Sequence, residues 1–163
     1  MKKSTIIIAA ILSCTMLAGC GNSTSSDSSV SASDNSAAEE KTPAEKTSEL
    51  LGAVEFPSMV EVPSDDLSVR YGIDADKVSS FSAYVCGSGA MPDEFGVFEA
   101  VDETAAADIK TALESRIEKQ KETYTDYTPD EMYKFDGFLL KQNGTTVVYA
   151  VCADNVAAEG ILG

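Results

Sequence analysis

The sequence predicts an α+β domain in which an antiparallel sheet of about four strands packs on one long helix. The four strands and the long helix follow one another in the order ββαββ. A short lead-in helix precedes them, and a short C-terminal helix follows them. Three observations support this fold class: a strand-like pair, a single apolar helical stripe, and an Asn-Gly turn between two apolar segments. These features lie at residues 78–86 with 94–101, at 103–124, and at 135–141 with 146–152.

The first helix is predicted over residues 65–71, with Ser64 as the N-cap and Gly72 as the stop. The preceding stretch, 56–63, reads as an extended apolar segment interrupted by prolines. Residues 78–86 alternate in the manner of a strand, and a glycine-containing loop leads to the second strand.

The long helix is predicted to begin after Asp102, which is a suitable N-cap. Its buried stripe recurs at steps of three and four residues. The stripe consists of Ala106, Ile109, Leu113, Ile117, Gln120 and Tyr124. Thr128-Pro129-Asp130 then breaks the helix.

The hairpin that follows is predicted to turn at Asn143-Gly144, a favoured two-residue loop. With that loop, the residue numbers of two opposed positions add up to 287, so that Leu140 faces Val147. Both faces of the hairpin are apolar, which predicts a covering layer on each. We expect the long helix on one face and a smaller element, such as the 50–72 segment, on the other. Asp154 is the predicted cap of the final helix, which runs to about Leu162.

The first twenty residues have the layout of a secretory signal: two lysines, an uncharged run over 4–19, and then Cys20. The last part of this leader, Leu17-Ala18-Gly19-Cys20, resembles the lipobox of bacterial lipoproteins. That resemblance implies cleavage between Gly19 and Cys20 and a diacylglyceryl group on the Cys20 thiol. A plain signal, or an uncleaved anchor with an incidental cysteine, is the alternative.

Three parts are therefore expected along the chain: a signal peptide at 1–19, a lipidated cysteine with a polar tether at 20–49, and one domain at 50–163. The tether is rich in serine, asparagine and acidic residues, and Val30 is its only large apolar side chain before the domain. A segment of this kind buries too little surface to offset its ordering entropy, which predicts disorder.

Composition excludes several functions. The chain carries 12 basic and 27 acidic residues, a net charge of −15, which disfavours nucleic acid and anionic membrane surfaces as partners. It contains no histidine, so Ser–His and Cys–His nucleophile pairs and the commonest zinc ligand sets are missing. The carboxylates fall on predicted exposed faces. We therefore expect no enzymatic activity, no metal and no cofactor.

Cys86 and Cys152 each end a predicted strand. If those strands are neighbours, a disulfide could join them; two buried free thiols are the alternative. Asp74-Ala75-Asp76 lacks the rest of a calcium loop, and Gly87-Ser88-Gly89 lacks the frame of a nucleophile elbow. Both are predicted to be ordinary loops.

From Ser64 to about Val156 the order of short motifs resembles a family of small bacterial lipoproteins known as domain of unknown function 4358. The motifs are Tyr71-Gly72-Ile73-Asp74, Asp93-Glu94-Phe95-Gly96-Val97-Phe98-Glu99-Ala100, Leu113-Glu114-Ser115-Arg116 with Gln120, Tyr127-Thr128-Pro129, and an apolar strand running into Asp154. The resemblance implies a lipobox leader, a polar tether and a small domain. It implies no particular activity.

These observations predict a lipid-anchored protein on the extracytoplasmic face of the cell membrane. Its domain is expected to bind an unidentified protein or small molecule. A solute-binding accessory component of a transporter is the alternative, although such receptors generally close two lobes on their ligand.

Overall fold

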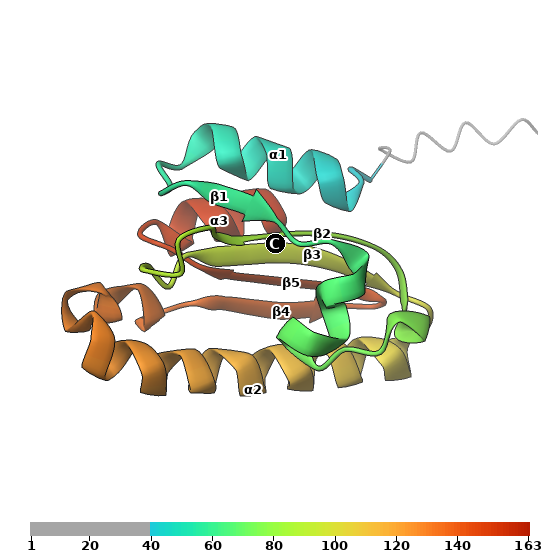
Figure 1. Ribbon diagram of the computed structural model, residues 1–163. Coiled ribbons are helices and arrows are strands. Elements are labelled where there is room, and N and C mark those ends of the chain that lie inside the picture. The colour runs from blue at the N-terminus through green and yellow to red at the C-terminus, as the bar shows by residue number, and fades with distance from the viewer. Residues whose placement is uncertain (1–39) are drawn as a thin grey trace, which may run out of the picture. The chain divides into compact units, whose positions relative to one another are not determined.

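The computed structural model describes residues 40–163, which fold into three layers (Figure 1). A five-stranded antiparallel sheet forms the middle layer, α1 and α3 cover one face, and α2 covers the other. The α+β prediction is confirmed. The predicted signal peptide, the Cys20 lipidation site and most of the predicted tether lie outside the described residues.

The strands are β1 (Met59–Glu61), β2 (Val78–Cys86), β3 (Glu94–Ala100), β4 (Leu139–Asn143) and β5 (Thr146–Val151). Their order in the sheet is β1-β2-β3-β5-β4, and every neighbouring pair is antiparallel. The sequence predicted about four strands. The fifth strand, β1, is only three residues long. Pro57 and Pro63 flank it, and it is short because proline cannot donate a backbone hydrogen bond to extend the ladder.

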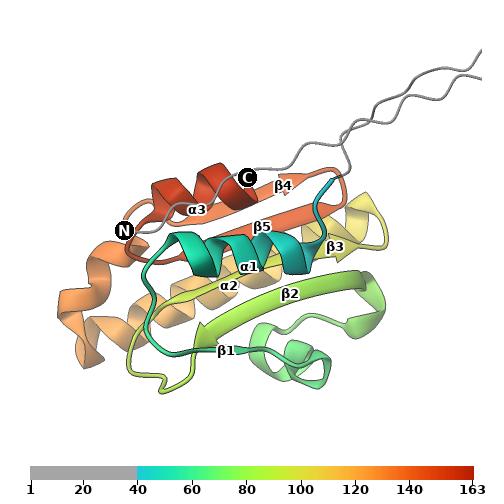
Figure 2. The same ribbon diagram turned by 90° about the horizontal axis from the view of Figure 1, so that it is seen from above.

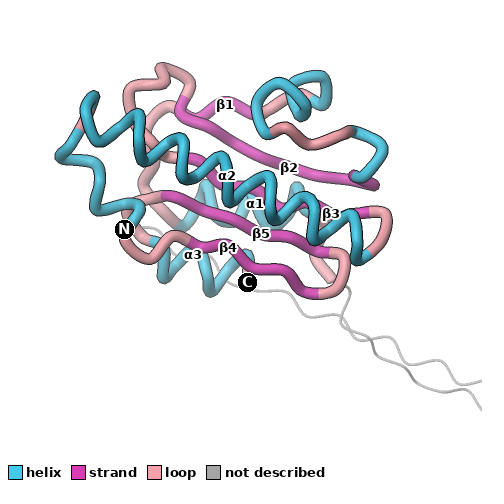
Figure 3. The backbone as a smooth tube through the Cα atoms, turned by 90° about the horizontal axis from the view of Figure 1, so that it is seen from below, coloured by secondary structure: helices cyan, strands magenta, loops and turns pink. Residues whose placement is uncertain are grey.

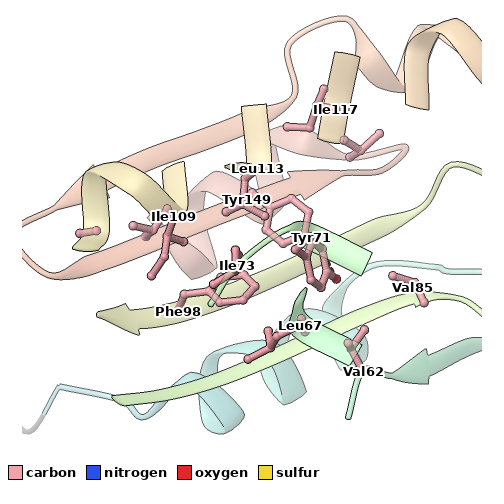
Figure 4. Close-up of a cluster of buried hydrophobic side chains, with 14 of the residues drawn as sticks. Val62, Leu67, Tyr71, Ile73, Val85, Phe98, Ile109, Leu113, Ile117 and Tyr149 are labelled. Atoms are coloured by element: carbon pink, nitrogen blue, oxygen red, sulfur yellow. Dashed lines mark hydrogen bonds between the residues drawn. The ribbon is translucent and has the colours of Figure 1, made fainter. Parts of the chain in front are cut away.

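Helix α2 (Glu103–Tyr127) begins where it was predicted, because the Asp102 side chain accepts a hydrogen bond from the Ala105 N–H at 2.8 Å. The apolar members of the predicted stripe are all buried beneath the sheet. Figure 4 shows Ile109, Leu113 and Ile117 beside Tyr149 and Phe98 of the strands. The stripe therefore fixes the face that α2 presents to the core.

The predicted hairpin register is wrong by one residue on each strand. Asn143 pairs with Thr146, so the two-residue loop is Gly144-Thr145, and Leu140 lies opposite Tyr149 rather than Val147. Gly144 has a φ of 57°, which glycine adopts without a Cβ penalty, and the ladder therefore extends to Asn143. The shift moves each partner by two positions, which leaves the predicted faces unchanged.

The second face of the sheet is covered by α1 (Pro43–Ala53) and α3 (Asn155–Leu162), which lie side by side in Figure 2. The expected tether boundary at residue 49 is therefore wrong. Thr42 and Glu45 form a capping box that starts α1 early, and the side chain of Leu50 is fully buried.

The segment expected to cover that second face lies mainly on the α2 side instead. It contains two short helical turns, η1 (Ser64–Asp66) and η2 (Leu67–Tyr71), and η2 ends at Gly72 with a φ of 69°. Leu67 and Tyr71 are buried in the same core as α2. Figure 3, seen from below, shows these turns beside the sheet on the side of β1 and β2. This arrangement places η2 next to α2.

Candidate functional site

A buried carboxylate lies where β3 begins. Glu94 is 1% exposed and accepts hydrogen bonds from Arg116 Nε at 2.9 Å and Arg116 Nη2 at 2.5 Å. Gln120 Nε2 donates a third at 2.7 Å. Arg116 and Gln120 are four residues apart on α2, so both side chains reach the same point. We call Glu94, Arg116 and Gln120 the Glu94 cluster.

The Glu94 cluster also holds η2. The second terminal nitrogen of Arg116 donates to the Arg70 carbonyl at 2.8 Å, and its guanidinium lies 4.8 Å from the centre of the Tyr71 ring. Arg116 is therefore fixed from three sides. Burial raises the pKa of the Glu94 carboxyl, while Arg116 and Gln120 favour its charged form.

Two tyrosines meet below η2. The Tyr71 and Tyr149 hydroxyls are 2.8 Å apart, and burial raises the pKa of both, so they stay protonated at neutral pH. Tyr149 pairs across the sheet with Gly96. A Cβ on Gly96 would lie 2.9 Å from the Tyr149 ring and 2.8 Å from the Ala83 Cβ. The glycine of the Asp93–Ala100 motif therefore makes room for the tyrosine pair.

A groove of about 600 Å³ lies between η2 and α2, over the Glu94 cluster. We call it the η2–α2 groove. Its lining is Ser68, Val69, Arg70, Tyr71, Gly72, Ala112, Ser115, Arg116, Lys119, Gln120 and Thr123. Three of these residues are basic and none is acidic, in a chain with 27 acidic and 12 basic residues. The groove therefore differs in charge from the rest of the protein.

A smaller cavity of about 190 Å³ shares Arg70, Arg116 and Gln120 with the groove and is also lined by Cys86 and Tyr124. The Tyr124 hydroxyl lies 2.9 Å from both the Gly89 and Met91 carbonyl oxygens. This contact holds the β2–β3 loop against α2.

A second buried ion cluster adjoins the first along the chain. Lys134 Nζ lies 2.6 Å from Asp93 Oδ2 and 2.6 Å from Glu131 Oε2. We call Lys134, Asp93 and Glu131 the Lys134 cluster. Burial alone would lower the pKa of Lys134, but these two carboxylates raise it above the ordinary value. The prediction that the carboxylates lie on exposed faces is therefore wrong for Asp93 and Glu94, which are 2% and 1% exposed.

The two thiols do not pair. Cys86 and Cys152 are both buried and free. The possible disulfide required neighbouring strands, but β3 separates β2 from β5. Strands two positions apart are about 10 Å apart, beyond the roughly 7 Å that a disulfide can bridge. The alternative, two buried free thiols, matches the structure.

The two thiols are expected to react differently. Burial raises the Cys86 pKa, but the Ser88 hydroxyl and nearby backbone N–H groups outweigh it and leave the pKa below its ordinary value. Burial raises the pKa of Cys152 to about 11. At pH 8 only about one Cys152 side chain in a thousand is therefore in the thiolate form.

In a Cys14→Ser/Cys20→Ser chain, iodoacetamide should therefore label Cys86 before Cys152, as measured by peptide mass spectrometry between pH 7 and 9. Faster labelling of Cys152 would contradict this.

The remaining motifs have structural roles. Asp74 and Asp76 lie at an exposed turn, η3 (Ala75–Lys77), and the Ser88 hydroxyl lies 3.3 Å from the Cys86 sulfur in the β2–β3 loop. Within residues 40–163, no cluster of three or more Asp, Glu or Cys side chains could hold a metal ion. In the same range, no helix combines the length and apolar character needed to cross a membrane.

Comparison with known protein families finds a match that covers most of the domain. The model of the family named Domain of unknown function (DUF4358) matches residues 52–152. The chain belongs to this family. The DUF4358 match includes the Glu94 cluster, the Lys134 cluster and every residue that lines the η2–α2 groove. No curated protein and no solved structure matches the chain.

Three of the short motifs described in the sequence converge in space, although they are far apart along the chain. Arg116 and Gln120 donate to the Glu94 carboxylate, and the Tyr71 ring packs against Arg116, so residues from three of the motifs meet at this point. Gln120 was the signal in the sequence, since it is a polar residue at a position of the apolar helical stripe. A polar side chain on a buried stripe requires a buried partner, and Glu94 is that partner.

Proposed function

We propose that this DUF4358 protein is a lipid-anchored extracytoplasmic protein that binds a small ligand in the η2–α2 groove. The lipobox-like leader that precedes Cys20 supports the anchor. The two acyl chains of such an anchor, at about 0.8 kcal/mol per buried CH₂, would hold the protein stably on a bilayer. The polar segment after Cys20 would then tether the domain near the membrane.

The groove is the observation that carries the binding role. Its volume of about 600 Å³ falls in the usual range of small-molecule sites. Arg116 forms a rigid part of its floor, and Val69 on its rim is 90% exposed. A preformed floor of fixed polar groups suits a small ligand whose own polar groups match them.

A binding role is preferred over a catalytic one because both buried carboxylates are neutralised by cations. Glu94 is paired with Arg116 and Asp93 with Lys134. Neither carboxylate is among the residues that line the η2–α2 groove, so neither is placed to exchange a proton with a ligand there.

Native mass spectrometry of the protein extracted in mild detergent from the membranes of cells that make it tests both parts of the proposal. We expect a chain that starts at Cys20 and carries a diacylglyceryl mass, with a second, dissociable small-molecule mass. A Cys20→Ser chain should lose the lipid mass and leave the membrane fraction. An unmodified Cys20 would contradict the anchor, and a protein free of any dissociable mass would contradict the ligand.

A further inference from the structure

We infer that the η2–α2 groove takes a hydroxylated organic anion whose phosphate or carboxylate group lies against Arg70, Arg116 and Lys119. This inference rests on the proposed function and names the ligand class of the same groove. It follows from the charge of the lining, the state of each cation and the hydroxyl groups that border them.

Two of the three cations are available to a ligand. No salt bridge involving Lys119 is present among residues 40–163, and its side chain is exposed. Arg70 has one salt-bridge partner in that range, Asp66 at 3.6 Å, and both side chains are more than one-third exposed. A surface pair of this kind is weak, so an anion in the groove can compete with Asp66 for Arg70.

Arg116 contributes oriented donors rather than net charge. Glu94 already neutralises it, but a guanidinium has five N–H groups, and the contacts to Glu94 and to the Arg70 carbonyl use one on each nitrogen. One N–H on each terminal nitrogen remains. Because Arg116 is fixed before a ligand arrives, these donors cost little ordering entropy when they bind an oxyanion.

The hydroxyl groups indicate the rest of the ligand. Ser115 Oγ donates to the Thr111 carbonyl at 3.0 Å, and Thr123 Oγ1 donates to the Lys119 carbonyl at 2.9 Å. Their protons are committed, so their oxygens can only accept hydrogen bonds from a ligand. A ligand with hydroxyl donors beside its anionic group matches this lining. The volume of about 600 Å³ also exceeds what an inorganic ion fills.

Isothermal titration calorimetry of the mature lipidated protein in detergent tests the inference with four probes. Glycerol 3-phosphate and citrate carry both an anion and hydroxyl groups, inorganic phosphate carries the anion alone, and glycerol carries the hydroxyl groups alone. We expect glycerol 3-phosphate or citrate to bind at least about tenfold more tightly than glycerol. Added salt should weaken that binding. Inorganic phosphate that matches glycerol 3-phosphate would show that the oxyanion alone is recognised and overturn the hydroxylated part of the inference.

Charge-reversed variants locate the site. Lys119→Glu should weaken binding by about tenfold or more, because it places a negative charge in the groove. Lys110→Glu makes the same change on the same helix outside the groove lining, and it should leave binding unchanged. Equal affinity of Lys119→Glu and the natural chain would overturn the inference. Circular dichroism melting of both variants checks that each is folded.

The outcomes separate the inference from the proposed function. A neutral co-purifying ligand whose adduct is lost when the groove is altered would overturn the anionic class but leave the binding role intact. The absence of any co-purifying mass, together with no binding of any probe, would overturn both.

Discussion

Replacing Arg116 with methionine is expected to lower the free energy of unfolding by about 3–5 kcal/mol, because it leaves a buried carboxylate without its cation. Glu94 is 1% exposed, so water cannot replace the lost contacts. A loss of this size is a large part of the 5–15 kcal/mol stability that is typical of a domain. Urea unfolding followed by circular dichroism measures it.

Two comparisons make this result specific. Arg70→Met removes an exposed arginine and its 3.6 Å contact to Asp66, and it should cost less than about 1 kcal/mol. The double variant Glu94→Leu/Arg116→Met removes the charge together with its partner, and it should be more stable than Arg116→Met alone. If Arg116→Met and Arg70→Met cost the same, the Glu94 cluster does not organise the core around it.

Lys134→Met is expected to have a similar effect, about 3–5 kcal/mol at pH 7, because it leaves Asp93 and Glu131 together without a cation. The direction in which the free energy of unfolding of Lys134→Met changes with pH follows from the same two carboxylates. Protonation of one carboxyl relieves the uncompensated charge, so the folded variant binds a proton more readily than the unfolded chain. The free energy of unfolding of Lys134→Met should therefore rise as the pH falls from 7 to 5.

Lys141→Met is the matched control for Lys134→Met. Lys141 pairs with Glu159, but both side chains are more than half exposed, and the change should cost less than about 0.5 kcal/mol. Urea midpoints measured between pH 5 and 8 provide the comparison. A Lys134→Met chain that loses stability toward pH 5, or that matches Lys141→Met throughout, would show that the Lys134 cluster contributes no buried charge pairing.

The elements with strong periodicity were predictable from sequence. Strand 78–86 and the start of the long helix at residue 103 match the structure, because alternation and a side-chain cap are local signals. The hairpin loop was placed one residue early, since both Asn143-Gly144 and Gly144-Thr145 can form a turn and the ladder decides between them. Helix α1 was missed because its low-complexity neighbours obscured the Thr42-to-Glu45 capping box.

The candidate site was not predictable as a unit. Glu94 and Arg116 are 22 residues apart in sequence, and Tyr71 comes from a third segment. Burial of Asp93 and Glu94 depends on α2 and the η4 turn (Pro129–Phe135), whose Arg116 and Lys134 cover the start of β3, and composition cannot reveal this contact. The polar Gln120 on an apolar stripe was the one local indication of a buried partner. Fold follows from local patterns here, whereas the charge clusters follow from tertiary contacts.

Photo-crosslinking from the groove rim tests most directly whether the η2–α2 groove is the binding surface. A benzoylphenylalanine placed at Val69, which is 90% exposed, should give a discrete small-molecule adduct when the lipidated protein is irradiated in intact cells. The same group at Val156, which is 83% exposed on α3, should not give it. Loss of the adduct in a Lys119→Glu chain would support the groove as the site. Equal adducts from both positions, or none from Val69, would contradict it.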